Sequence, residues 1–500
     1  MEQLPTLLSW SISARNPLIL AFLLGMIAAM TFLLTARPRL YLPLILVTTP
    51  LPKLFTIMQY ESWGKHQTAA GFSVGDMVLA AGLAALLLRG WRRSHVRIGW
   101  PVGSALLLWS GSIWLSVAMG LALWPGIYRP NNALYAFRYV LSLLSYAVAV
   151  RYAMDQRDER SVRSLLRQLT LAGNITIALG VLYYFTVGIS VVGTSSGILF
   201  SADGSVFRSY LFFFDYGGDM GYFAVTIAIL NIIRLSNART LGPRLISGAG
   251  LSLCVAAVLL LGERVNVLLL AVSLGYFLLE TAKAKHRSVR VSIAFQVACL
   301  LAVLGAGSVI VRVAAPKQII EKYNSTVSKS DFASTAADAM TQEGVPPAIV
   351  TAVSGLPIGD LVVRLSLSIA SIWFFFQHPL GVGFWGELPV VGWNAHHEIV
   401  KTAVEQGIPG LAAFAWLMVT LRRLLWARGD LSGSGGELGV LLRSISAGFF
   451  VALLAANTVL LDMKYAMIYW TLVGVWSALP RTRITRLAPV PIPDRKAVNV

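Results

Sequence analysis

Residues 100–124 read WPVGSALLLWSGSIWLSVAMGLALW and contain no charged side chain. About 20 apolar residues in a helix cross the hydrocarbon core of a bilayer, so this stretch predicts a transmembrane helix. Comparable runs recur along the whole chain, and we expect about 12 or 13 spanning helices in all. The other runs lie near 16–35, 40–56, 74–89, 133–153, 168–192, 217–234, 245–262, 265–281, 291–313, 408–426, 438–460 and 465–480.

The composition excludes a soluble globule. Of the 500 residues, 56% are hydrophobic and 13% are charged, whereas soluble proteins carry about 25% charged residues. The two cysteines, Cys254 and Cys299, both lie in apolar runs. Neither a disulfide framework nor a thiolate zinc cluster is therefore expected. The expected fold class is an all-α integral membrane protein.

The net charge of +18 is interpreted as an orientation signal. Most of the basic residues fall in every second loop, and such loops face the cytoplasm. The sequence therefore predicts a cytoplasmic C-terminus and requires no nucleic-acid partner. The basic clusters include Arg89, Arg92, Arg93 and Arg97; Arg151, Arg157, Arg160, Arg163 and Arg167; Arg234, Arg239 and Arg244; Lys283, Lys285, Arg287 and Arg290; Arg422, Arg423 and Arg428; and Arg481, Arg483 and Arg486, with Arg443 counted on the same side.

The predicted spans divide the chain into four parts. Residues 1–313 form the N-terminal set of transmembrane helices, in which 40–56 is expected to be re-entrant or tilted because prolines interrupt it. Residues 314–407 form one large outer, periplasmic segment, whose apolar run Leu361–Phe376 predicts a helix on or in the outer interface. Residues 408–480 carry the C-terminal spans, and 481–500 form a cytoplasmic tail.

Four ionisable residues fall at the outer ends of predicted spans: Arg208, Arg264, Arg364 and His396. Ionisable groups in such places are candidates for function. Arginine binds phosphate oxygens and stays charged at any working pH, and a histidine can accept a proton near neutrality. This set therefore suits transfer from a phosphate-linked donor. A lone arginine at a helix end more often reaches toward the headgroups or pairs with a neighbour such as Glu263.

Two motifs in the outer segment have simpler explanations. Residues 381–386 fit the dinucleotide fingerprint G-x-G-x-x-G, but they follow an apolar helical run and precede no βαβ unit, so a tight turn is expected. His397-Glu398 begins H-E-x-x-H, but Lys401 replaces the second histidine and excludes that zinc motif. A looser metal site remains open, and its ligands would come from His378, His396, His397, Glu387 and Glu398.

Two blocks of the outer segment resemble the O-antigen ligase and polysaccharide polymerase superfamily of bacterial membranes. In the first, Arg364 precedes Pro379-Leu380-Gly381-Val382-Gly383; in the second, His396 precedes Glu405, Gly407 and Gly410. Arg208 and Arg264 are similar to two further family arginines. The family has asparagine after the histidine, where this chain has His397.

The resemblance implies an inverting, metal-independent glycosyltransferase of the GT-C type without a cofactor, in the bacterial inner membrane with its site facing the periplasm. It implies that His396 activates the acceptor hydroxyl and that Arg208 and Arg264 hold the diphosphate of an undecaprenyl-linked glycan donor. Arg364 would orient donor or acceptor, and the acceptor would be a glycan, a lipid A core or a protein. The expected substrate-binding residues are His397, Glu405 and Asp462, although Asp462 is also explained as a helix cap or salt-bridge partner.

Alternatives remain at two levels. Phe72-Ser73-Val74-Gly75-Asp76 resembles exopolysaccharide polymerases and slightly favours a polymerase over a ligase. The alternative to an enzyme is a secondary transporter or a translocator of lipid-linked glycans. The ionisable residues of such a protein should lie near the bilayer midplane. Only Arg138 is selected as a basic residue at that depth.

Overall fold

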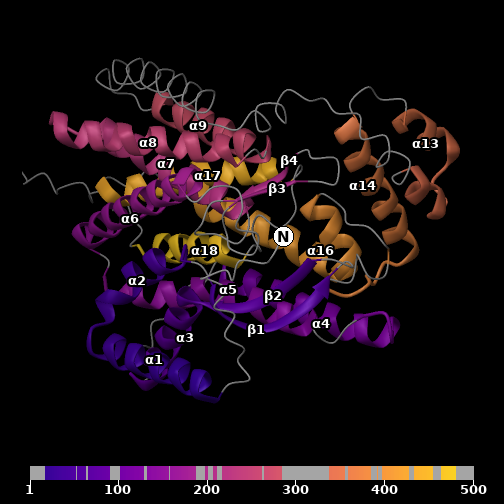
Figure 1. Cartoon of the computed structure of the whole chain (residues 1–500), viewed down its shortest axis with the longest axis horizontal. Helices are drawn as coiled ribbons and strands as arrows, with labels where there is room; N and C mark the ends of the chain where they lie inside the picture. The colour runs from indigo at the N-terminus through magenta and orange to yellow at the C-terminus, as the bar shows by residue number, and fades with distance from the viewer. Residues whose placement is uncertain are drawn as a thin grey trace, which may run out of the picture.

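Long helices make up most of the chain in a computed structural model (Figure 1). The structure describes residues 17–51, 53–62, 66–89, 102–128, 132–156, 158–186, 197–200, 206–210, 217–261, 264–283, 337–354, 359–384, 391, 397–426, 433–453 and 463–479. Its helices are α1 (Pro17–Ala36), η1 (Pro38–Leu40), α2 (Tyr41–Thr48), α3 (Val74–Leu88), α4 (Gly103–Leu123), α5 (Asn132–Met154), α6 (Glu159–Thr186), α7 (Gly217–Asn237), α8 (Leu241–Leu260), α9 (Arg264–Lys283), α13 (Pro347–Ser354), α14 (Gly359–Gln377), α16 (Glu398–Trp426), α17 (Gly433–Ala452) and α18 (Met463–Ala478).

The helical membrane architecture expected from the sequence is confirmed. Among the described residues, six helices are long and apolar enough to span a membrane, or seven if one bent pair is a single span. Helices α3, α5 and α9 contribute shorter apolar segments, and the predicted span 291–313 lies outside the described residues. The described part therefore accounts for fewer full spans than the 12 or 13 expected.

Residues 40–56, expected to be re-entrant or tilted, do not form one continuous helix, and the bent pair that includes α2 is either a broken span or a re-entrant loop. The bent pair turns by 114° between Ala21–Ala36 and Pro38–Thr48, and α2 ends at Thr48. Strand β1 (Lys53–Ser62) then pairs antiparallel with β2 (His66–Ser73). Prolines at 50 and 52 offer no backbone N–H for a continuing helix.

Strands thus add to the helical fold that the sequence predicted. A second antiparallel pair joins β3 (Gly197–Phe200) to β4 (Val206–Tyr210). Between β2 and α3, the Ser73 and Asp76 side chains each accept a hydrogen bond from the other residue's backbone N–H, at 3.2 and 2.7 Å. This capping box begins α3, so Phe72–Asp76, which suggested a polymerase, has a structural role in starting a helix.

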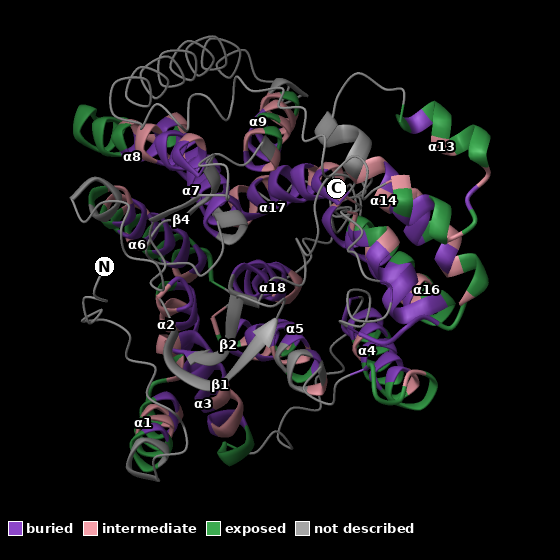
Figure 2. Ribbon diagram, turned by 45° about the vertical axis from the view of Figure 1, so that its right-hand side comes forward, coloured by how far each residue is buried: buried purple, intermediate pink, exposed green. Residues whose placement is uncertain are grey.

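Helix α18 lies in the middle of the bundle, with α5, α17 and α2 around it (Figure 2). Its side chains from Tyr465 to Trp476 are buried. The Tyr465 hydroxyl shares a hydrogen bond of 2.6 Å with Thr226 of α7, and the Tyr469 hydroxyl shares one of 2.7 Å with Ser446 of α17. Such bonds between helices, together with close packing, hold membrane bundles together.

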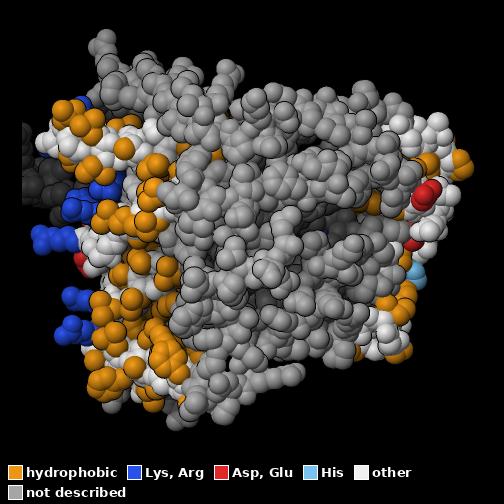
Figure 3. All heavy atoms as spheres, viewed as in Figure 1, with side chains coloured by type: hydrophobic (Ala, Val, Ile, Leu, Met, Phe, Trp, Pro, Cys, Tyr) orange, Lys and Arg blue, Asp and Glu red, His pale blue; other side chains and the backbone are white. Residues whose placement is uncertain are grey.

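One end of the bundle is strongly basic. Figure 3 shows exposed Lys and Arg side chains gathered there. Helix α7 ends at this end of the bundle. The side-chain amide of its last residue, Asn237, donates a hydrogen bond of 2.7 Å to Glu437 in the first turns of α17. Helix α5 ends and α6 begins at the same level, where Arg163 and Glu159 lie near Glu437. We call this the basic end.

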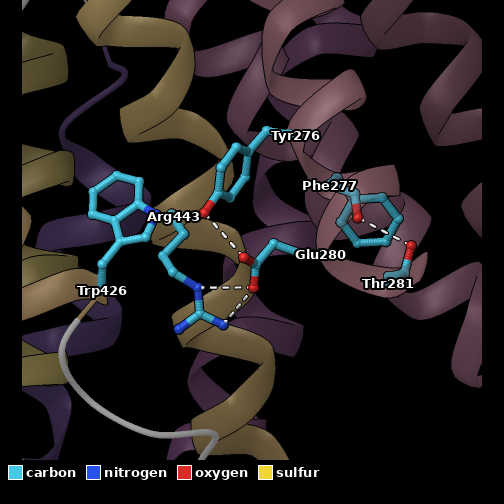
Figure 4. Close-up of polar contacts among 6 residues, drawn as sticks. All are labelled: Tyr276, Phe277, Glu280, Thr281, Trp426 and Arg443. Carbon is cyan, nitrogen blue, oxygen red and sulfur yellow. Dashed lines mark hydrogen bonds and ion pairs between the residues drawn. The ribbon is translucent and has the colours of Figure 1, made fainter. Parts of the chain in front are cut away.

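A buried ion pair joins α9 to α17 (Figure 4). The Arg443 guanidinium lies 3.1 Å from a Glu280 carboxylate oxygen, and the two side chains are 7% and 18% exposed. Tyr276 donates a hydrogen bond of 3.0 Å to Glu280, and Trp426 at the end of α16 donates to Tyr276. Arg443 was counted with the cytoplasmic cations and lies inside the predicted span 438–460; within α17, Glu280 compensates its charge.

Removal of either partner should destabilise the bundle. We expect Glu280→Leu to leave a buried unpaired guanidinium and to lower the free energy of unfolding by about 3–5 kcal/mol. The double variant Glu280→Leu/Arg443→Met should lose less than either single variant. Unfolding in mixed micelles of mild detergent and dodecyl sulfate, followed by circular dichroism, measures both.

The matched control is Arg163→Ala, which breaks an exposed pair with Glu159 of 2.7 Å. Exposed pairs contribute about 0–1 kcal/mol. A Glu280→Leu variant that unfolds no more easily than Arg163→Ala would contradict a structural role for the buried pair.

Candidate functional site

The elements that carry three predicted site residues begin at the end of the bundle opposite the basic end. Helices α7, α9 and α16 all finish toward the basic end, as the contacts of Asn237, Glu280 and Trp426 establish. Their first residues therefore lie at the other end. Strand β4 directly precedes α7, Arg264 is the first residue of α9, and His396 precedes α16 by two positions in the sequence.

The structure places some of these residues only by their backbone. Arg208 lies in β4 opposite Leu199 of β3, and Arg264 opens α9, while their side chains are outside the described part. His396 and Asp462 lie outside the described residues altogether.

Three further predicted residues are described with their side chains. Arg364 is half-buried on α14, a helix that covers the predicted apolar run and packs against α16. His397 is half-buried immediately before α16, and its carbonyl accepts a hydrogen bond of 2.8 Å from the Lys401 amide. Glu405 is buried within α16. Arg364 and Glu405 thus lie on two helices in contact, and His397 directly precedes one of them.

Helix α16 is broken near its middle. Gly407 has φ 66° and ψ −163°, which is a conformation open essentially to glycine alone. Pro409 follows and has no N–H to donate to the Glu405 carbonyl four residues earlier. The Ile408 amide, which would reach Val404 in a regular helix, instead donates to Pro379 at 2.9 Å. The break leaves two carbonyls of the half-helix, Glu398–Gln406, without helical partners.

The loop after α14 supplies the missing partners. The Val382 amide donates to the Val404 carbonyl and the Gly383 amide to the Glu405 carbonyl, each at 2.9 Å. The Ser116 hydroxyl of α4 also donates to the Glu405 carbonyl, at 2.8 Å. We call these bonds and the one from Ile408 the clasp. They join the loop Pro379–Gly383 to the broken part of α16.

Glycine is required on both sides of the clasp. Gly381 and Gly383 have φ of 82° and 99°. A Cβ on Gly381 would lie 2.7 Å from the Glu405 carbonyl oxygen, and one on Gly407 would lie 2.5 Å from the Leu380 carbonyl carbon. The Gly381 amide donates a hydrogen bond of 3.0 Å to the His378 carbonyl, so a tight turn directly follows α14 and ends at Gly381, as expected for the first of these glycines.

Three ionisable side chains lie buried on one face of the half-helix. Glu398, Lys401 and Glu405 are 1%, 6% and 3% exposed, and their spacing of three and four residues puts them on the same face. The Lys401 ammonium lies 4.0 Å from a Glu405 carboxylate oxygen. Sequence reasoning selected Glu405 but missed the other two as buried charges, although the i, i+3, i+7 spacing was a usable signal.

The open metal hypothesis gains no support from the described residues. Within them, no group of three or more His, Cys, Asp and Glu side chains could hold a metal ion. His378 packs between the rings of Trp124 and Phe374, at centroid distances of 5.5 and 4.4 Å. The other histidine ligand that the structure describes, His397, lies before the half-helix, whereas His396 and Glu387 are outside the described part.

The fold defines a multi-pass helical membrane protein with one basic end and a clasped, broken helix that begins at the other. Comparison with protein-family models finds no match to this chain, and comparison with curated proteins finds none either. The function is therefore argued from the residues of the site.

The clasp should depend on its glycines. We expect Gly407→Ala to lower the free energy of unfolding by roughly 2–5 kcal/mol, because the new Cβ meets backbone in a conformation that alanine avoids. Detergent unfolding followed by circular dichroism measures this change. Gly111→Ala in α4 is the control, since its Cβ would meet no atom within 4 Å. Equal stability of the two variants would contradict the clasp.

Proposed function

We propose that this protein is a membrane glycosyltransferase that joins or extends an undecaprenyl-diphosphate-linked glycan at the periplasmic face of the bacterial inner membrane. The observation that carries the proposal is the clasp. Two blocks that are separate in the sequence, Pro379–Gly383 and Glu405–Gly410, resemble one enzyme superfamily and are hydrogen-bonded to each other. Their joint packing supports reading them as parts of one site.

The proposed chemistry is a single inverting displacement. His396 takes the proton from an acceptor hydroxyl, whose oxygen forms a bond to the anomeric carbon of the donor sugar. The bond from that carbon to the diphosphate oxygen breaks, and undecaprenyl diphosphate leaves. Arg208 and Arg264 stabilise the negative charge that grows on the leaving group. Arg364 orients donor or acceptor, with His397, Glu405 and Asp462 assigned to the substrate.

The proposed orientation puts the basic end in the cytoplasm, in accord with the positive-inside rule. The clasped end then faces the periplasm, and the C-terminal tail lies in the cytoplasm. The prenyl chain would rest against the apolar spans, and the acceptor would be a growing glycan, a lipid A core or a protein. A ligase and a polymerase share this chemistry.

Replacement of the proposed base gives the direct test. We expect His396→Ala to reduce glycan transfer at least 100-fold, on the order of the contribution of a general base, while insertion and unfolding stay unchanged. The assay uses the purified full-length protein and lipid-linked glycans extracted from cells of its source that lack it. His378→Ala is the matched control and should keep its activity. Normal turnover by His396→Ala would refute the assignment.

A secondary transporter or lipid-linked glycan translocator is the second candidate. The observation that favours it is the buried Glu280–Arg443 pair within the bundle, because ionisable groups inside a membrane often serve transport. The alternative predicts that Glu280→Gln abolishes movement of lipid-linked glycan across vesicles. The transferase predicts that a folded Glu280→Gln protein keeps its transfer activity.

A further inference from the structure

Ser116 lies within α4 and is 2% exposed. Its hydroxyl donates to the Glu405 carbonyl, which Pro409 leaves without a helical partner. One turn earlier, the Ser112 hydroxyl donates to the Gln406 side-chain oxygen at 3.0 Å. Two serines of α4 therefore contact the last two residues of the half-helix before Gly407.

A single carbonyl thus joins three segments that are far apart in the sequence. The Glu405 oxygen accepts from Ser116 of α4 and from Gly383 of the loop after α14. A helix broken at a glycine has freedom to pivot there unless other groups hold it. The bonds at Glu405 remove this freedom and fix the direction of the half-helix relative to α4.

The direction of the half-helix determines the position of its first residues. The helix starts at Glu398, and the Lys401 amide extends its hydrogen bonding to the His397 carbonyl. His396 is the preceding residue in the sequence. A pivot at Gly407 would therefore displace the first turn of the half-helix by an amount that grows with distance from the break.

We infer that Ser116 is a positioning residue of the transfer reaction: its hydroxyl helps to fix the half-helix, which follows His397 and, in the sequence, the proposed base His396. This inference rests on the proposed function. Ser116 touches no reacting atom and acts through the Glu405 carbonyl. Displacement of a catalytic group by about 1 Å can cost on the order of 100-fold in rate, so loss of one bond in the clasp is expected to reduce turnover and leave donor binding intact.

The test compares three variants of the full-length protein in lipid nanodiscs, with lipid-linked glycans extracted from cells of its source that lack it. We expect Ser116→Ala to lower kcat roughly tenfold, within the range that small displacements cause, with an unchanged KM for the donor. Ser116→Thr keeps the hydroxyl and should recover at least half of the turnover. If Ser116→Ala does not fold, Ser116→Cys, which has a weaker donor, replaces it with the same expectation.

Ser145→Ala is the matched control. Ser145 is also a buried serine, and it donates to the Met467 carbonyl of a neighbouring helix at 3.3 Å, away from the clasp. This variant should keep its kcat. Full turnover by Ser116→Ala, or a raised KM with unchanged kcat, would overturn the inference and leave the proposed function standing. Absence of transfer by the unsubstituted protein would overturn the proposed function, and the inference with it.

Discussion

The break in the backbone at Gly407–Pro409 requires hydrogen-bond donors from outside α16. A helix in an apolar bundle cannot leave carbonyls unsatisfied, because no water is present to donate hydrogen bonds to them. The break in α16 creates two such carbonyls. Backbone amides of the loop after α14 and a serine hydroxyl of α4 donate hydrogen bonds to them. Helices α4, α14 and α16 are therefore brought together by a requirement of the backbone.

Polar contacts also fix the arrangement elsewhere in the bundle. Reciprocal amide hydrogen bonds of 3.1 and 2.8 Å join Asn174 of α6 to Asn231 of α7. The Glu280–Arg443 pair connects α9 to α17 near the basic end. Apolar surfaces pack in many ways with similar energies, whereas each of these pairs requires one partner. The polar groups therefore select one arrangement among the helices.

Much of the fold could be predicted from hydropathy. The charge-free run 100–124 became α4 over Gly103–Leu123, and the predicted span 217–234 became α7 over Gly217–Asn237. The prolines of 40–56 indicated an interrupted run, but hydropathy could not predict that strand β1 begins at Lys53. The pairing of Arg443, inside the predicted span 438–460, with Glu280 could not be predicted, because the two residues are 163 positions apart in the sequence. Hydropathy and charge patterns describe the composition along the chain, and they do not show which residues distant in the sequence pair with each other.

The candidate site could likewise be predicted only in part from the sequence. The residue types and spacing of Pro379–Gly383 and Glu405–Gly410 were recognisable, and their relation to each other was not. Ser116 carries no signal at all in the sequence, since buried serines are common in membrane helices. Its role follows only from the carbonyl that it faces.

The left-handed conformation of Gly407 bears on how this chain can diverge during evolution. Any side chain at this position would meet the Leu380 carbonyl group, so the glycine is retained for as long as the kink is retained. Relatives with different ligands, or with none, would keep it equally. Conservation of these glycines would therefore indicate a shared backbone conformation. Differences in the bound ligand would have to be sought at other positions.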